Sequence, residues 1–355
     1  MKERIERLQE NLPAHLDGVI ITSDVNRRYY LGMASTAGTL LVTRKEAVLL
    51  IDFRYYEEAA RTVTGCRVVR QEKVLDQLNQ IIREEKLAAL GLESGYMTLA
   101  EACRLRDGLS CQVDFGGEMN GIILRQRAVK SPWERERIAQ AQAISDKAFL
   151  RMLEIIKPGM TEREIATQLE ITCLRLGSED KSFDPIVVAG PNSSSPHGHP
   201  GSRPVQKGDF LTMDFGAVVD GYHADMTRTI AIGQPTSEME EVYRIVLEAK
   251  EAATAAIRPG IPGDQVDRVA RQLIADRGYG DCFGHGLGHG VGLEIHEAPA
   301  FSPSAKGPVE EGSVISVEPG IYLEGRFGVR IEDLVEVTAG GARRLNTTPT
   351  SLVIL

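Results

Sequence analysis

Acidic residues stand at two similar places in this sequence, with a spacing that could hold metal ions. Asp214 precedes a turn at Asp220-Gly221 and Asp225 follows it, so an antiparallel hairpin would make the two aspartates near neighbours. Aspartate is poor in strand interiors, and the flanking residues here are mostly apolar. Two carboxylates buried together repel each other and are costly to desolvate. This pair therefore needs a compensating cation.

A second hairpin repeats the anomaly. Glu318 follows the run Ser313–Val317, and Glu332 follows Gly328–Ile331. A single pair of acids could simply face solvent. Four carboxylates at strand positions of two similar hairpins instead predict a shared acidic site.

Histidines and glycines gather between the two hairpins. Five of the nine residues from 284 to 292 are glycine, which lets the backbone approach other groups closely. Six of the seven histidines fall between His197 and His296, and only His15 lies elsewhere. Carboxylates with one imidazole form a hard donor set that suits Mn, Fe or Co better than structural zinc. Two bridged ions activate water and polarise a carbonyl, so these residues indicate metal-assisted hydrolysis.

The residues around these hairpins form a hidden repeat. When the chain is offset by 104 residues, Pro158-Gly159 falls on Pro262-Gly263, and residues 208–221 fall on 312–325 without a gap. The match predicts a duplicated unit of helix, connection and hairpin. Two such halves would pair about a pseudo-twofold axis, with equivalent carboxylates facing each other.

The elements that position the site fall into two predicted domains. The first 125 residues alternate short apolar runs with helical segments, which predicts a small α/β domain. Strands are expected at 18–22, 39–43, 47–51 and 87–92, and helices at 74–85 and 99–106. Ser131-Pro132-Trp133-Glu134 is a capping box that starts a long helix, which ends at Pro158-Gly159. We place the domains at 1–126 and 127–355.

Composition excludes several classes of protein. The 355 residues are 42% hydrophobic and 26% charged, the balance of a globular rather than a disordered chain. The net charge of −9 argues against nucleic acid and anionic membranes as partners. There is no apolar run long enough to span a membrane, and no apolar signal core at the start. Five cysteines without a CxxC pair indicate free thiols, so we expect a cytoplasmic protein.

The motifs resemble those of a known family. They are HGLGHGVGLEIHE (285–297), PHGHP (196–200), MDFG (213–216), HADMTRT (223–229), VEPG (317–320) and RIED (330–333). Together they resemble the pita-bread metallopeptidases, and most of all prolidase and aminopeptidase P, which cleave Xaa-Pro bonds. The first 125 residues look like the creatinase-type N-terminal domain of these enzymes. The resemblance thus covers the whole chain and implies a mixed α/β fold.

The resemblance implies a ligand set for two divalent metal ions. Asp214 would chelate one ion, Asp225 and Glu332 would bridge both, and His289 and Glu318 would complete the other site. Glu318 would also accept a proton from the attacking water. Mn or Co is favoured, with Fe or Zn left open, because metal availability decides among such ions.

The resemblance also implies residues that meet the substrate. His197 and His296 would line the pocket and hydrogen-bond the substrate carbonyl and the tetrahedral intermediate. His285 would face the substrate, and Arg330 would steady Glu332 or a neighbouring charge. For His285 and Arg330, a purely structural role stays open.

Three further residues carry weaker expectations. Phe183 resembles part of the family's substrate wall and would pack on a proline ring, although core packing is an equal alternative. His199 is either a surface residue or a specificity contact. His223 precedes a predicted ligand strand and is expected to be structural or to support the ligands.

The implied activity is dinuclear metal-dependent hydrolysis of Xaa-Pro bonds in short proline-containing peptides, with release of the N-terminal residue. Whether the enzyme is a dipeptidase or an aminopeptidase stays open, and the resemblance implies a homodimer. Three alternatives remain. A methionine aminopeptidase is disfavoured by the long N-terminal domain. A metal-free creatinase-like relative and a non-catalytic binding protein are disfavoured because all five ligand residues are present.

Overall fold

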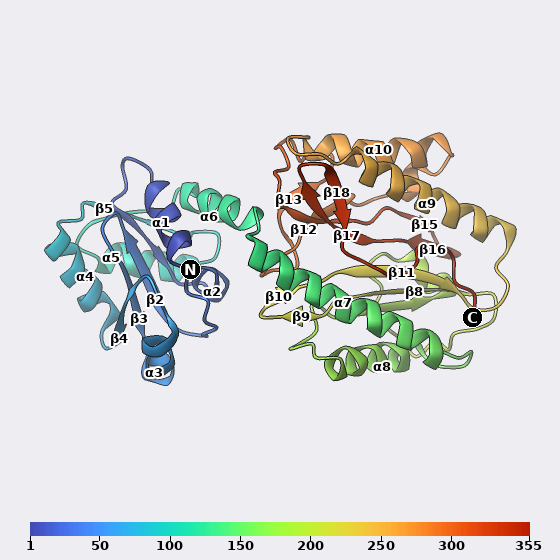
Figure 1. The fold of residues 1–355 in the computed structure, drawn as a ribbon, viewed down its shortest axis with the longest axis horizontal. Helices are drawn as coiled ribbons and strands as arrows, with labels where there is room; N and C mark the ends of the chain where they lie inside the picture. Colours follow the sequence, from blue (N-terminus) through green and yellow to red (C-terminus); the bar gives the residue numbers. More distant parts are fainter. The chain divides into compact units, whose positions relative to one another are not determined.

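A mixed six-stranded sheet organises the first part of the chain (Figure 1). The computed structural model describes all 355 residues, which divide into the units Met1–Arg127 and Ala128–Leu355. In the first unit, the strand order is β4-β3-β2-β1-β5-β6, with β2 antiparallel to both neighbours and the other pairs parallel. The strands are β1 (Gly18–Ile21), β2 (Thr39–Thr43), β3 (Ala47–Ile51), β4 (Arg67–Arg70), β5 (Ala89–Leu92) and β6 (Gln112–Asp114).

The helices of this unit cover the sheet. They are α1 (Lys2–Glu10), α2 (Asp24–Leu31), α3 (Phe53–Thr62), α4 (Val74–Glu85), α5 (Leu99–Gly108) and α6 (Glu118–Ala128). Strands β1, β2 and β3 are buried along their whole length, as expected for strands that alternate with helices. Leu78 and Leu105, from α4 and α5, pack in one core with the central strands.

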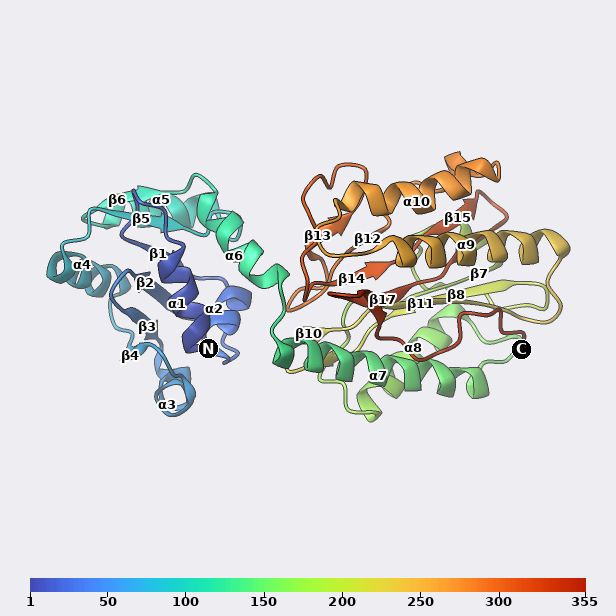
Figure 2. The same cartoon turned by 45° about the horizontal axis from the view of Figure 1, so that its top comes forward.

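In the second unit, two helix pairs enclose the sheets. Helices α7 and α8 lie on one side and α9 and α10 on the other (Figures 1 and 2). Each pair packs over its own apolar core. The helices are α7 (Pro132–Ile155), α8 (Glu162–Arg175), α9 (Ser237–Ala256) and α10 (Gly263–Asp276), with short 3₁₀ turns η1 (Gly190–Ser194) and η2 (Gly280–Cys282).

The strands between these helices form four antiparallel sheets. The larger two run in the orders β11-β8-β7 and β13-β12-β14-β17-β18, and the pairs β9-β10 and β15-β16 complete the set. The strands are β7 (Ile186–Ala189), β8 (Phe210–Phe215), β9 (Val218–Val219), β10 (Tyr222–His223), β11 (Met226–Ala231), β12 (Gly288–Gly290), β13 (Glu297–Phe301), β14 (Val314–Val317), β15 (Gly320–Leu323), β16 (Phe327–Arg330), β17 (Asp333–Thr338) and β18 (Gly341–Arg344).

The long helix α7 starts at the predicted capping box. The Ser131 side chain accepts from the Glu134 backbone N–H, and the Glu134 carboxylate accepts from the Ser131 N–H. Two of the four unpaired N–H groups at the helix start are satisfied in this way. The helix ends at Ile155, before Pro158, because the residue preceding a proline avoids helical backbone angles.

The structure corrects the alignment of the two halves. The hairpins match at the predicted offset of 104 residues, since Gly208 and Gly312 both adopt positive φ, at 93° and 88°. Helices α8 and α10 match at an offset of 101 residues instead. Buried positions of α8 at Ile165, Leu169 and Cys173 correspond to Val266, Ala270 and Ile274 of α10. The repeat therefore contains a three-residue gap. Pro259-Gly260, not Pro262-Gly263, is the counterpart of Pro158-Gly159.

The predicted hairpin turn forms at Asp220-Gly221. Both residues have positive φ, 50° and 72°, as a two-residue hairpin turn requires. Beyond this turn, β8 pairs with β11, with Asp214 opposite Thr227. Asp225 lies one residue before β11, so it comes close to Asp214.

One expectation about the acids was wrong. Only Asp214 lies within a strand, whereas Asp225, Glu318 and Glu332 lie in the short gaps between consecutive strands. At Glu318 and Glu332, the chain passes between the five-stranded sheet and the pair β15-β16. A break in the ladder there lets a side chain turn inward without costing sheet hydrogen bonds.

The C-terminal segment runs beside β11. The Ala231 N–H donates to the Val353 carbonyl at 2.9 Å, and the Leu355 N–H donates back to the Ala231 carbonyl at 2.9 Å. Thr347 and Thr348 bond to Asp146 of α7. The segment thus joins a helix of the first half to a strand that leads into the acidic site.

None of the helices combines the length and apolarity needed to cross a membrane. All five cysteines are free thiols.

Candidate metal centre and active site

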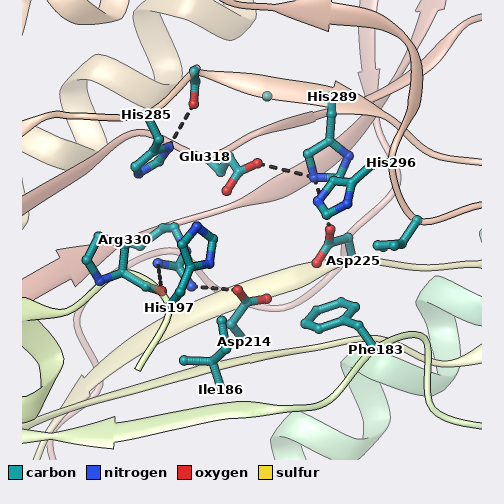
Figure 3. Close-up of a pocket in the computed structure, with 14 residues that line it drawn as sticks. Phe183, Ile186, His197, Asp214, Asp225, His285, His289, His296, Glu318 and Arg330 are labelled. Atoms are coloured by element: carbon teal, nitrogen blue, oxygen red, sulfur yellow. Dashed lines mark hydrogen bonds and ion pairs between the residues drawn. The ribbon is translucent and has the colours of Figure 1, made fainter. Parts of the chain in front are cut away.

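Both halves of the second unit supply side chains to one cavity of about 340 Å³ (Figure 3). The hairpins bring acidic residues, and the glycine-rich segment brings histidines. The predicted residues that line the cavity are Phe183, His197, Asp214, Asp225, His285, His289, His296, Glu318 and Arg330. Glu332 is the only predicted site residue outside this lining, and it is 1% exposed.

Glu332 nevertheless belongs to the same cluster. Donor atoms of Asp225, His289 and Glu332 all lie within 4.8 Å of one another, close enough to share a metal ion. His289 Nε2 lies 3.5 Å from Asp225 Oδ2 and 3.3 Å from Glu318 Oε1. All five predicted ligands therefore come together, with Asp214 beside Asp225.

The imidazole of His289 is set up as a ligand by its backbone neighbour. Its Nδ1 lies 3.1 Å from the Gly290 carbonyl oxygen, which can only accept, so Nδ1 carries the proton. Burial lowers the pKa of His289, which favours the neutral ring. The Nε2 lone pair then faces the carboxylates, as a metal-binding histidine requires.

Arg330 is the cation that holds Asp214. Its Nη2 donates to Asp214 Oδ2 at 2.5 Å, and its Nε donates to Thr227 Oγ1 at 3.0 Å. The Thr227 hydroxyl donates in turn to Glu332 Oε2 at 2.8 Å. Arg330 thus contacts Asp214 directly and reaches Glu332 only through Thr227.

The site has the electrostatic character of a cation cage. Four carboxylates face one arginine, and Asp214 Oδ1 and Glu332 Oε1 are buried without a hydrogen-bond partner. Burial raises the pKa of Asp225 and Glu332 well above their ordinary values, and nearby carboxylates raise them further. Burial also raises the pKa of Glu318. Oxygen donors with unmet negative charge fit hard divalent cations, so the donor set agrees with a pair of metal ions.

A pH experiment on metal-free protein tests this cage. A carboxyl group with a raised pKa stabilises the fold below its ordinary pKa, and this stability is lost as pH rises through the folded value. The neutral amide of Glu332→Gln does not titrate. We therefore expect the variant to gain stability relative to wild type as pH rises above the ordinary range of a glutamate.

The measurement is the melting temperature of EDTA-treated wild type and Glu332→Gln at several pH values from 5 to 8. Added Mn²⁺ should reverse the order, because only wild type keeps the full ligand set. A difference that does not change with pH would mean that Glu332 is not held as a neutral acid in the metal-free fold.

His285 uses both ring nitrogens inside the protein. Nδ1 lies 2.8 Å from the Gly286 carbonyl oxygen, and Nε2 lies 2.9 Å from the Tyr322 hydroxyl. The same hydroxyl accepts from Arg330 Nη1 at 3.0 Å. His285 thereby joins Tyr322 and Arg330 in one chain of hydrogen bonds.

The other histidines differ in place. The His296 ring meets the His289 ring edge-on, with centroids 4.2 Å apart, and His197 lines the cavity from a segment that is largely exposed. His199 is exposed and outside the cavity lining. His223 Nδ1 lies 2.9 Å from Ser182 Oγ, next to Phe183.

Apolar side chains also line the cavity. They belong to Phe183, Ile186, Pro196 and Ile295. Phe183 therefore faces the cavity, and of its two expected roles the position fits a substrate wall. Sequence reasoning missed the other three residues, because isolated apolar residues in a chain that is 42% hydrophobic carry no signal.

Thr227 and Tyr322 were also missed. Each connects Arg330 to a second site residue. A weak signal was available for both, since each is a hydroxyl-bearing residue within a strand next to a predicted ligand.

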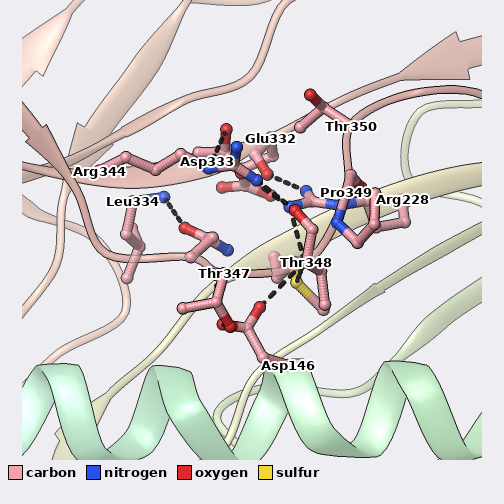
Figure 4. A network of polar contacts seen from close by, with 12 residues as sticks. Asp146, Arg228, Glu332, Asp333, Leu334, Arg344, Thr347, Thr348, Pro349 and Thr350 are labelled. Atoms are coloured by element: carbon pink, nitrogen blue, oxygen red, sulfur yellow. Dashed lines mark hydrogen bonds and ion pairs between the residues drawn. The ribbon is translucent and has the colours of Figure 1, made fainter.

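A second cation, Arg228, lies behind the ligands (Figure 4). Its side chain is 2% exposed, and five acceptors surround it, which matches the five N–H groups of a guanidinium. The acceptors are the carbonyl oxygens of Thr227, Glu332 and Pro349, together with Thr348 Oγ1 and Asp333 Oδ1. The side chain thus ties β11, the Glu332 backbone and the C-terminal segment to one point.

Comparison with family models places both units. Residues 136–339 match the metallopeptidase family M24, and residues 4–129 match the creatinase/prolidase N-terminal domain. The chain belongs to the M24 metallopeptidases, with a creatinase-type N-terminal domain and the pita-bread catalytic fold. The family implies peptide substrates and a dinuclear metal site, for which Asp225, His289 and Glu332 are candidate ligands.

Relatives match along nearly the whole chain. An uncharacterized peptidase of Bacillus subtilis is 37% identical over 344 residues, 96% of each chain. A structure of an Xaa-Pro dipeptidase from Bacillus anthracis has a TM-score of 0.96 at 36% identity, over 99% of each chain. A structure of an X-Pro aminopeptidase from Thermotoga maritima has a TM-score of 0.89 at 36% identity, over 98% of this chain and 99% of that one.

Proposed function

We propose that this protein is an Xaa-Pro peptidase that hydrolyses short proline-containing peptides and releases the N-terminal residue. The observation that carries the proposal is the cavity, which four of the five proposed ligand residues, three further histidines and several apolar side chains line, with the fifth ligand residue, Glu332, buried beside it. Two similar structures, of an Xaa-Pro dipeptidase and an X-Pro aminopeptidase, support the same bond specificity. We assign the activity to residues 127–355 and the creatinase-type domain to residues 1–126.

Two divalent ions, when bound by the five ligands, would supply an activated water and a polarised substrate carbonyl. Asp214 would hold one ion, His289 and Glu318 the other, and Asp225 and Glu332 would lie between them. Glu318 lines the cavity with its Oε1 3.3 Å from His289 Nε2, so its carboxylate would be placed to accept a proton from the attacking water. Mn or Co is the proposed metal.

The protein side chains would then stabilise the reacting carbonyl. His296 and His197 lie on the cavity wall, where their ring N–H groups would hydrogen-bond the oxygen as negative charge develops on it. Arg330 would keep Asp214 oriented, and His285 would hold the Tyr322 hydroxyl beside Arg330. Phe183 and Ile295 would pack on the substrate's apolar groups, the proline ring among them.

A substrate panel tests the bond specificity. We expect Mn-loaded protein to release alanine from Ala-Pro or Ala-Pro-Ala at least about 10-fold faster than from Ala-Ala, since one pocket contact is worth about that much discrimination. Free alanine is the measured product. Metal-loaded protein that cuts Met-Ala-Ser and spares both proline peptides would replace the proposal with a methionine aminopeptidase.

The same panel decides the length limit. Cleavage of Ala-Pro alone would identify a dipeptidase whose pocket is closed behind proline. Efficient cleavage of Ala-Pro-Ala would identify an aminopeptidase with room for a longer chain. We further propose a cytoplasmic homodimer, which light scattering on purified protein tests for its oligomeric state.

A further inference from the structure

A buried ion pair lies beneath the active-site loop and has no part in the chemistry above. Lys130 Nζ and Glu297 Oε1 are 3.5 Å apart, and the two side chains are 1% and 2% exposed. Lys130 stands just before helix α7, and its backbone N–H donates to the Gly312 carbonyl at 3.0 Å. Neither residue lines the cavity.

The partner Glu297 stands at the base of a loop that shapes the cavity. Gly290 and Glu297 pair across β12 and β13, so residues 291–296 form a closed loop between them. This loop carries Ile295 and His296 to the cavity wall. His296 lines the cavity whereas the Glu297 side chain is buried outside it, so the two neighbouring side chains lie on different sides of the chain.

The Glu297 carboxylate supports the loop from below. A Cβ added to Gly292 would lie 1.5 Å from Glu297 Oε1 and 3.2 Å from Lys130 Cε. The carboxylate therefore rests directly against the loop backbone, and Lys130 lies beside it. Gly292 is held from another side too, because its carbonyl accepts from the His223 N–H at 2.8 Å.

Stability alone does not explain such a pair. Desolvating two charges costs about as much as their attraction returns, so buried ion pairs are commonly near neutral for stability. A pair fixed beneath one short loop instead restricts where the loop can lie. We propose that Lys130 and Glu297 are positioning residues that hold loop 291–296, and thereby the His296 ring, against the substrate. The inference rests on the proposed function, in which His296 contacts the reacting carbonyl.

A double-mutant cycle tests the proposal. Removing both charges in Lys130→Met/Glu297→Gln avoids leaving one of them buried and unpaired. We expect kcat on the cleaved proline peptide to fall about 10-fold, as for residues that orient a catalytic group, with KM and metal content unchanged. In a His296→Ala background, the same pair of changes should alter kcat by less than about two-fold, because the group that it positions is gone.

A second variant keeps the charges. Gly292→Ala pushes a methyl group into the Glu297 carboxylate, and we expect the same loss of kcat and the same insensitivity in the His296→Ala background. Arg203→Met/Asp209→Asn is the matched control, since it removes a partly buried ion pair of the same unit that lies outside the cavity. The control should keep kcat.

Amide hydrogen exchange gives a readout that does not depend on activity. The amides of residues 291–296 should exchange faster in the Lys130→Met/Glu297→Gln protein than in wild type. Their exchange rates should be unchanged in the control variant. Equal losses of kcat with and without His296, or an unchanged exchange rate in the loop, would overturn the positioning role. Failure of wild type to cleave any Xaa-Pro peptide would overturn the proposed function instead. The exchange experiment would still decide whether the ion pair holds loop 291–296.

Discussion

Glu332→Gln is expected to abolish peptide hydrolysis while leaving the fold intact. The substitution keeps the size of the side chain and its contact with Thr227, but removes the charge from one of the two proposed bridging carboxylates. Changes to groups that merely orient ligands cost about 10- to 100-fold, so loss of a bridging ligand should cost at least about 100-fold. Asp225→Asn should behave in the same way.

The measurements are initial rates on the cleaved peptide, metal content by elemental analysis and the melting temperature. We expect fewer than two bound ions in Glu332→Gln and little change in the metal-free melting temperature near pH 5. Glu311→Gln, at an exposed position of the same unit, is the matched control and should resemble wild type. Near-normal turnover in a metal-verified Glu332→Gln protein would contradict the dinuclear assignment.

Asp333→Asn is expected to cause the largest loss of stability of any single charge removal behind the site. Asp333 pairs with Arg228, Lys250 and Arg344, and the side chains of Arg228 and Lys250 are each 2% exposed. Neutralising this anion leaves Arg228 in the interior without a counter-charge, and leaves Lys250 with only the exposed carboxylate of Glu251. Breaking a buried pair from one side costs about 3–5 kcal/mol, so the free energy of unfolding should fall by that amount.

The chain has a single tryptophan, Trp133, which packs edge-on against Tyr222 in the second unit, so its fluorescence follows urea unfolding of that unit. Lys250→Met should cost less, because Asp333 keeps both arginines. Glu154→Gln is the control. It breaks the surface ion pair of Arg151 and Glu154, whose side chains are both more than 60% exposed, and it should lower the free energy of unfolding by less than about 1 kcal/mol. An Asp333→Asn protein as stable as Glu154→Gln would show that the cations do not depend on Asp333.

The gathering of the acidic residues at one site could be predicted because its signal is local, whereas their individual roles as ligands came from the family resemblance and stay proposals. Carboxylates in apolar surroundings are anomalous wherever they occur, and the hairpin turn at Asp220-Gly221 fixes which residues face each other. The glycine-rich segment with its histidines can likewise be recognised from the sequence alone. The pita-bread fold and the creatinase-type domain, which the resemblance of the motifs implied, were confirmed by the family models.

Features that depend on distant partners could not be predicted. The three-residue gap in the repeat shows only when buried helix positions such as Ile165 and Val266 are compared. The role of Arg228 could not be predicted, because four of its five acceptors lie on two distant parts of the chain, Glu332-Asp333 and Thr348-Pro349. The Lys130–Glu297 pair joins residues 167 positions apart, and no local pattern links them.

The anchoring of Arg228 has a consequence for the order in which the protein is made. Two of its acceptors, on Thr348 and Pro349, follow every other residue of the site along the chain. During translation, the ligand-bearing strands leave the ribosome before the segment that ties them together. The hydrogen-bond network of Arg228 can therefore be completed only once Thr348 and Pro349 have left the ribosome. An affinity tag placed near Thr348 and Pro349 would therefore interfere with the formation of these contacts, whereas a tag at Met1 would not.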